Sequence, residues 1–174
     1  MTQNENKADF DIYTEEQEII SLNNFLILNF VTLGLYEIWW IYKAWRFFAQ
    51  KDRLDIMPAV RAITNIFFLY SLLRRIYDYG KAHGYAGEFS PVLFYIGFIL
   101  VNFLGVLPAP FNLLSLLGMI FFIQPFNALN TAKINDKKIR VKIQYGFNGR
   151  QIFLLIFGVL IWTAFIGGTV AGLE

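Results

Sequence analysis

The amino-acid sequence predicts an all-α integral membrane protein with about four transmembrane helices and one further re-entrant or interfacial helix. Hydrophobic residues make up 56% of the 174 positions and charged residues only 16%, whereas an ordinary soluble domain carries about 25% charged residues. The apolar residues gather in long runs and do not alternate with polar ones, as they would in the strands of an outer-membrane barrel. We expect one membrane domain, residues 23–174, behind an acidic polar tail, residues 1–22.

The tail is expected to lie at the surface and to contain a short helix. Thr14 followed three residues later by Gln17 has the pattern of a capping box. The first apolar run follows at residues 25–45, and Asn23 and Asn24 are suitable N-caps for it. At about 1.5 Å per residue this run is long enough to cross a hydrocarbon core of roughly 30 Å.

The second apolar run, residues 56–73, is too interrupted for a full span. Pro58 stands where a first helical turn would begin, and Arg61, Thr64 and Asn65 break up the apolar residues that follow. Short apolar runs of this kind occur in re-entrant helices, in interfacial helices and in helices buried among others. We therefore expect a half-inserted segment.

Three more spans are predicted towards the end of the chain, at residues 92–107, 112–130 and 151–171. The first two are separated by Pro108 and Pro110, which cannot continue a helix and predict a tight helical hairpin. The last run contains no charge between Arg150 and Glu174 and is the plainest transmembrane signal in the sequence.

A basic loop, residues 131–150, precedes the last span and is expected to be cytoplasmic. Within it, basic and apolar residues alternate with period two: Lys138, Ile139, Arg140, Val141, Lys142 and Ile143. No equally good partner strand is visible. We expect an extended segment on the membrane surface, with its apolar side down and Lys138, Arg140 and Lys142 facing anionic lipid head groups.

Basic residues in three clusters, within 43–53, 74–81 and 133–150, set the expected orientation. The positive-inside rule places all three on the cytoplasmic side. If residues 25–45 cross the bilayer, both termini then lie outside. If that run re-enters, the acidic tail stays in the cytoplasm. We favour the crossing arrangement, because the run is long enough to span and a short acidic tail is easily translocated.

Several motifs resemble a group of small bacterial multi-pass inner-membrane proteins with domains of unknown function. They are "TLGLYEIWWIYKAW", "MPAVRAI", "YSLLRRI" and "IQPFNALN", and the resemblance covers roughly residues 25–130. The group shares a Thr-x-Gly-Leu-Tyr turn before an aromatic helix that ends in Lys. The resemblance implies a bacterial inner-membrane location and brings no activity, cofactor or catalytic residue.

Glu37 is the first candidate functional residue, because an ionisable group inside an apolar run is costly unless it is paired or hydrated. Lys43 and Arg46 fall on other faces of an ideal helix, so Arg61 is the best candidate partner. Alternatively, Gly34 breaks the helix, and Glu37 occupies the favourable first turn of a new one at the interface. Ion or substrate binding and proton coupling are the functional alternatives.

A second set of polar candidates lies near the end of the fourth run. Gln124, Asn127 and Thr131 share one face of a helix that Pro125 kinks, and Asn130 lies alongside them. Interhelical hydrogen bonds explain them most simply, and a polar lining for a ligand or a lipid head group is the alternative. Ala164, Gly168 and Gly172 form a small-residue face, which indicates close packing within the chain or in a homo-oligomer.

These residues favour a binding function over catalysis. Cysteine is absent and His83 is the only histidine, so no disulfide, thiolate metal site or histidine cluster can form, and no phosphate loop or nucleophile elbow is present. We expect no enzyme activity, no cofactor and no nucleic-acid partner. The expected function is an accessory, regulatory or immunity-type subunit of another membrane protein. The alternative is a small oligomeric transporter or channel using Glu37, Arg61 and the Gln124–Asn130 face.

Overall fold

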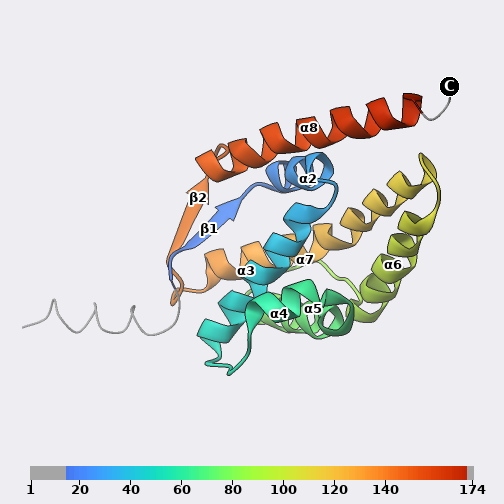
Figure 1. Ribbon diagram of the computed structural model, residues 1–174. Coiled ribbons are helices and arrows are strands. Elements are labelled where there is room, and N and C mark those ends of the chain that lie inside the picture. Colours follow the sequence, from blue (N-terminus) through green and yellow to red (C-terminus); the bar gives the residue numbers. More distant parts are fainter. Residues whose placement is uncertain (1–14, 172–174) are drawn as a thin grey trace, which may run out of the picture.

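Helices make up most of the chain in the computed structural model, which describes residues 15–171 (Figure 1). The elements in chain order are β1 (Gln17–Ile20), α2 (Leu22–Val31), α3 (Leu35–Lys51), α4 (Pro58–Ile63), α5 (Asn65–Ala82), α6 (Pro91–Phe103), the 3₁₀ helices η1 (Leu104–Val106) and η2 (Phe111–Met119), α7 (Ile120–Asn135), β2 (Val141–Gln144) and α8 (Gly149–Ala171). The predicted all-α class is confirmed, with one small sheet added.

The first apolar run forms a helical hairpin, so the prediction of one helix over residues 25–45 is wrong. The Thr32 hydroxyl donates to the carbonyl of Leu28 at 2.7 Å and accepts from the backbone N–H of Tyr36 at 3.0 Å, which ends α2 and begins α3. Gly34 then reverses the chain with φ +87°, a conformation that costs glycine little. Phe25 packs on Trp40 with ring centroids 5.8 Å apart, so α2 folds back along α3.

The second apolar run also bends back on itself, with a break at Thr64 between α4 and α5. The segments that flank the run on either side meet. Asp52 forms an ion pair with Arg75 at 3.2 Å, and the Lys51 ammonium lies 4.9 Å from the ring centroid of Tyr79. This is the geometry that a re-entrant segment requires, although insertion of residues 56–73 into a bilayer stays a prediction.

The third hairpin joins α6 and η1 to η2 and α7, and it turns at Pro108 and Pro110 as the sequence predicts. Within residues 15–171, two helical segments are long and apolar enough to cross a membrane, Phe111–Asn135 and Gly149–Gly168. The apolar segment Pro91–Val106 is shorter. The structure thus supplies two candidate spans in place of the four expected.

The small sheet corrects the expected structure of both strand segments. β1 pairs with β2 in parallel, with Glu18 opposite Lys142, so the basic loop has the partner strand that the sequence did not reveal. The helix expected near Gln17 is absent because Gln17 donates its backbone N–H to the carbonyl of Arg140 at 2.8 Å; Thr14 lies outside the described residues. A surface segment without a partner strand was therefore the wrong expectation for residues 138–143.

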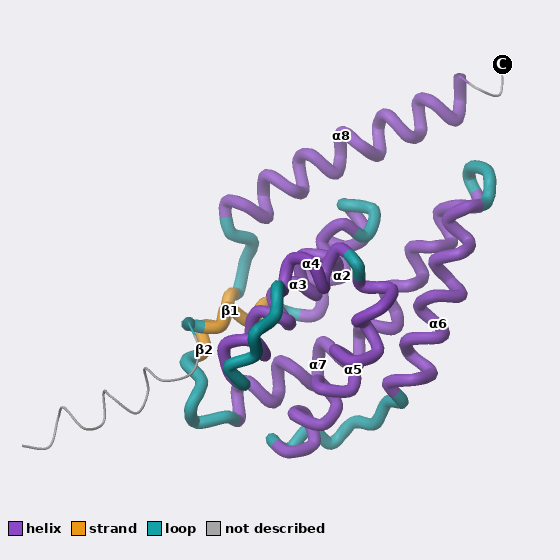
Figure 2. Tube along the Cα trace, turned by 60° about the horizontal axis from the view of Figure 1, so that its bottom comes forward, coloured by secondary structure: helices purple, strands orange, loops and turns teal. Residues whose placement is uncertain are grey.

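The N-terminal segment lies at the same end of the molecule as the basic loop. Besides the sheet, Arg46 near the C-terminal end of α3 holds Glu15 at 2.6 Å. In Figures 1 and 2 the sheet lies at one end, and the α6–η2 loop and the C-terminal end of α8 lie at the other. Residues 15–20 and the basic loop thus lie together at one end of the molecule, and the side of a membrane on which that end lies stays a prediction.

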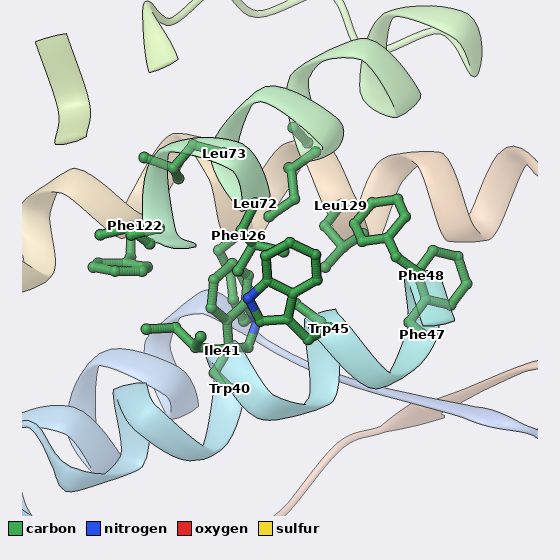
Figure 3. Close-up of a cluster of buried hydrophobic side chains, with 14 of the residues drawn as sticks. Trp40, Ile41, Trp45, Phe47, Phe48, Leu72, Leu73, Phe122, Phe126 and Leu129 are labelled. Atoms are coloured by element: carbon green, nitrogen blue, oxygen red, sulfur yellow. The ribbon is translucent and has the colours of Figure 1, made fainter. Parts of the chain in front are cut away.

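The core gathers on the buried face of α3, where large side chains recur at helical spacing. Figure 3 shows Trp40, Ile41 and Trp45 packed against Leu72 and Leu73 of α5 and Phe122, Phe126 and Leu129 of α7. Trp45 and Ile41 are fully buried. Because α3 touches α2, α5 and α7, its aromatic face holds the three hairpins together.

Helix α8 contacts the rest of the molecule along a narrow line. Trp162 stacks on Phe30 of α2 at 5.1 Å and donates its indole N–H to the Phe30 carbonyl at 3.2 Å, and Gly158 lies against Val31. Leu154 and Leu155 pack against the core, whereas many other apolar side chains of α8 are exposed: Ile152, Phe153, Ile156, Phe157, Val159, Leu160 and Ile166. An apolar surface of this extent requires an apolar environment or a partner.

The β1–β2 register makes a direct cross-linking prediction. We expect the double variant Glu18→Cys, Lys142→Cys to form an intramolecular disulfide on mild oxidation, because neighbouring strands lie about 4.8 Å apart and disulfides join Cα atoms about 4.4–6.8 Å apart. Non-reducing electrophoresis detects the closed loop. Glu18→Cys with Val106→Cys, at opposite ends, is the control and should stay uncross-linked. Absence of the first cross-link would contradict the sheet.

The contact of α8 with α2 can be tested at Gly158. A Cβ at this position would press on the backbone oxygen of Val31, whereas Gly167 has open space around it. We expect Gly158→Ala to lower the free energy of unfolding by about 1–3 kcal/mol, and Gly167→Ala, in the same helix, to keep it or raise it by up to about 1 kcal/mol. Thermal unfolding in detergent measures both, and equal melting temperatures would contradict this packing.

Candidate functional site

A pocket of about 550 Å³ opens at the basic end, between the sheet, α3, α7 and the start of α8. We call it the basic-end pocket. Its lining is formed by Gln17, Glu18, Ile20, Tyr36, Trp39, Trp40, Lys43, Ala44, Phe126, Leu129, Asn130, Lys133, Gln144, Asn148, Gly149, Arg150, Gln151, Phe153 and Leu154. Its size is that of a pocket for a small molecule or a lipid head group.

Three cations line the basic-end pocket: Lys43 on α3, Lys133 on α7 and Arg150 at the start of α8. Lys133 is only 6% exposed; its ammonium donates to the Gln17 side-chain oxygen at 3.0 Å and lies 4.4 Å from the ring centroid of Phe47. Within residues 15–171 none of the three cations forms an ion pair, and Glu18 is the sole acid in the lining. A buried ammonium without a counter-charge is costly, so the pocket favours an anion.

Amide side chains fix the start of α8 against α3. Asn148 caps the helix by accepting the N–H of Gln151 at 3.0 Å, and Gln151 in turn donates to the Tyr36 hydroxyl at 3.1 Å. Gln144, at the end of β2, donates to the same Gln151 side chain at 2.6 Å. The wall that carries Arg150 is therefore held by hydrogen bonds on two sides.

The rest of the pocket lining is aromatic and aliphatic. Trp39 and Phe153 are exposed, while Trp40 and Phe126 are buried and form the pocket floor with Leu129. Tryptophan at the boundary between an apolar and a polar region is typical of a membrane interface. Cations at one side and apolar walls at the other suit an anionic amphiphile.

The residues predicted near the end of the fourth run do not form one site. Asn130 lines the basic-end pocket, whereas Gln124 accepts a hydrogen bond from the hydroxyl of Tyr85, which lies in the loop between α5 and α6. Asn127 is half-buried on α7 and does not line the basic-end pocket. Lys138, Arg140 and Lys142 are exposed around β2, outside the pocket lining.

Glu37 and Arg61 do not form the predicted ion pair. The Arg61 guanidinium lies over Trp45 at 4.5 Å and over Phe68 at 4.9 Å, so the core aromatic residues hold it in place of a carboxylate. Glu37 occupies the first turn of α3 after Gly34, as the alternative prediction has it. It is 7% exposed and lines a second cavity, away from the basic end.

A hydrogen-bonded cluster joins the C-terminal ends of α5 and α7. The Tyr79 hydroxyl donates to an Asp136 carboxylate oxygen at 2.9 Å, and His83 Nε2 lies 3.3 Å from the same oxygen. Burial, with the nearby Asp136 carboxylate, raises the pKa of Tyr79, so its hydroxyl stays protonated as a donor. No local pattern in the sequence predicts this partner for His83, because the contact joins residues distant in the chain.

Lys133 is the functional candidate that the sequence could have revealed. It continues the buried spacing of Phe122, Phe126 and Leu129 on α7, which puts a cation at the end of an apolar face. Lys133 also belongs to a cluster of basic residues in the sequence, and that cluster obscures its place on the apolar face of α7. Gln17 carried no comparable signal, because strand pairing brings it to the pocket.

Comparison of the chain with protein-family models, curated proteins and solved structures gave no match. The chemistry of the residues in the pocket is therefore the basis for proposing a function.

The Tyr79 cluster can be tested by removing one hydroxyl. Tyr79→Phe removes the hydroxyl that donates to the Asp136 carboxylate and leaves His83 as the remaining side chain beside that oxygen, so we expect the free energy of unfolding to fall by about 1–3 kcal/mol. Tyr70→Phe, an exposed change on the same helix, is the control and should have no measurable effect. Denaturation monitored by tryptophan fluorescence compares the two, and equal stabilities would exclude a structural role for the cluster.

Proposed function

We propose that the protein is a multi-pass bacterial inner-membrane protein that acts by binding, and that it holds an anionic phospholipid at the basic-end pocket. The observation that carries this proposal is Lys133, a buried cation without an acidic partner in residues 15–171, in a pocket that also contains Lys43 and Arg150. A phosphate group supplies the missing charge, and the acyl chains suit the apolar walls.

The proposed orientation follows from the distribution of charge. Basic clusters are retained on the cytoplasmic side of bacterial membranes, so the end with β1, β2 and the basic loop faces the cytoplasm. The N-terminal segment shares that end through its pairing with β2. Phe111–Asn135 and Gly149–Gly168 then cross the bilayer, α6 with η1 completes the hairpin, and the other two hairpins enter only part of the way.

An accessory or regulatory subunit is the role that suits such a site. The lipid would lie against α8, whose start lines the pocket and whose exposed apolar face is available to another membrane protein. The alternative of a transporter built on Glu37, Arg61 and the Gln124–Asn130 face has less support, because these residues occupy separate surroundings.

The lipid site makes a charge-specific prediction. We expect native mass spectrometry from detergent to show retained phosphatidylglycerol and little phosphatidylcholine, since only the former is a net anion. Lys133→Met should weaken phosphatidylglycerol binding about tenfold or more, because one charge-assisted contact to phosphate is worth about 1.5–3 kcal/mol. Lys43→Gln should act in the same direction.

The matched control is Lys137→Gln, which removes an exposed cation next to the pocket but outside its lining. It should leave retention unchanged. Lys133→Met should keep or raise thermal stability, because an apolar side chain replaces a buried charge. Equal loss for all three variants would indicate nonspecific surface attraction and would contradict a lipid site in the pocket.

A further inference from the structure

A second cavity, of about 350 Å³, lies where the α2–α3 turn, the start of α5, the end of α6 and η2 meet. It shares no residue with the basic-end pocket. Its polar lining consists of Asn29, Glu37, Asn65, Asn102 and Ser115. The rest is apolar and includes Ile38, Phe98 and Met119.

Asn29 is a buried amide in the lining of this cavity. Its side chain is 1% exposed, and neither its amide nitrogen nor its amide oxygen has a hydrogen-bond partner. Buried polar groups are almost always satisfied, and an exception calls for a ligand or a bound water. Because Asn29 faces the cavity, whatever fills the cavity can satisfy it.

Glu37 is the one ionisable side chain in the lining of this cavity. It lies in the first turn of α3 and has no ion pair within residues 15–171. The other polar lining groups, three asparagines and one serine, are neutral and offer oxygen acceptors. One carboxylate among neutral acceptors matches one positive charge.

Interrupted helices surround the cavity that Glu37 lines. α2 ends and α3 begins at the cavity, and α5 starts beside it at Asn65. Broken helices that meet inside a membrane bundle are a recurring way to place backbone and side-chain polar groups around a small ion or substrate. The volume, however, is that of a pocket for a small organic molecule.

We propose that this cavity binds a small organic cation, a protonated amine that carries a short apolar substituent. The ammonium lies at Glu37 and donates to the oxygens of Asn29 and neighbouring amides, and the substituent lies against Phe98 and Met119. The site is independent of the phospholipid pocket, since the two ligands have opposite charge and different lining residues.

The experiment uses the full chain in nanodiscs and n-butylammonium as the probe. An alkylamine is protonated at neutral pH, as is the lysine side chain with its pKa of about 10.4. We expect isothermal titration calorimetry to detect saturable binding and thermal unfolding to shift upward with n-butylammonium concentration. The neutral analogue 1-butanol and inorganic ammonium should each bind more weakly.

Variants separate a ligand site from a structural one. Glu37→Gln should weaken n-butylammonium binding at least ~30-fold, whereas Glu88→Gln, an exposed glutamate at the other end of α6, should leave it unchanged. Asn29→Leu should raise the melting temperature of the free protein and lower the affinity, because it removes an unpaired buried amide that the ligand needs. A purely structural amide would not produce these opposite effects.

Three outcomes would overturn the proposal. If 1-butanol binds as well as n-butylammonium, the cavity is only an apolar void. If inorganic ammonium binds as well, the apolar walls contribute nothing and the site is one for a simple cation. If Glu37→Gln keeps wild-type affinity with an unchanged melting temperature, the carboxylate is not the ligand group.

Discussion

The packing of the aromatic face of α3 is the interaction on which the rest of the structure depends. Trp40 and Trp45 contribute large apolar areas, and the neighbouring hairpins close over them from α2, α5 and α7. Phe25, Phe122 and Phe126 join this cluster as contacting rings. Without that face, α2 and α4 would be short helices with little reason to stay docked, because short isolated helices are marginal.

Both candidate sites follow from the placement of α3. Tyr36, Trp40 and Lys43 recur at helical spacing and line the basic-end pocket, while Glu37 points to another side and lines the second cavity. The helix thus separates a cation-rich pocket from a cavity with one carboxylate. Since the core packing fixes the rotation of α3, it also fixes which charge enters which cavity.

Local signals predicted the parts of this arrangement that depend on neighbouring residues. Pro108 and Pro110 predicted the turn of the third hairpin, and Gly34 predicted the break before Glu37 under one of the two alternatives. The prediction of a continuous helix over residues 25–45 is wrong because hydropathy and length do not register two consecutive residues with positive φ, Leu33 and Gly34. Helical spacing could also have placed Lys133 on the buried face of α7.

Contacts between distant residues could not be predicted in the same way. β1 is only Gln17–Ile20, and its pairing with β2 depends on the hairpins that bring both strands to one end. The same closure forms the Lys133–Gln17 contact and the Tyr79–Asp136 hydrogen bond. The proposed bilayer accounts for two features that the packing within the chain leaves over. The exposed apolar faces of α6 and α8 are costly in water, and the buried Lys133 ammonium, which has no acidic partner within residues 15–171, suits an anionic head group.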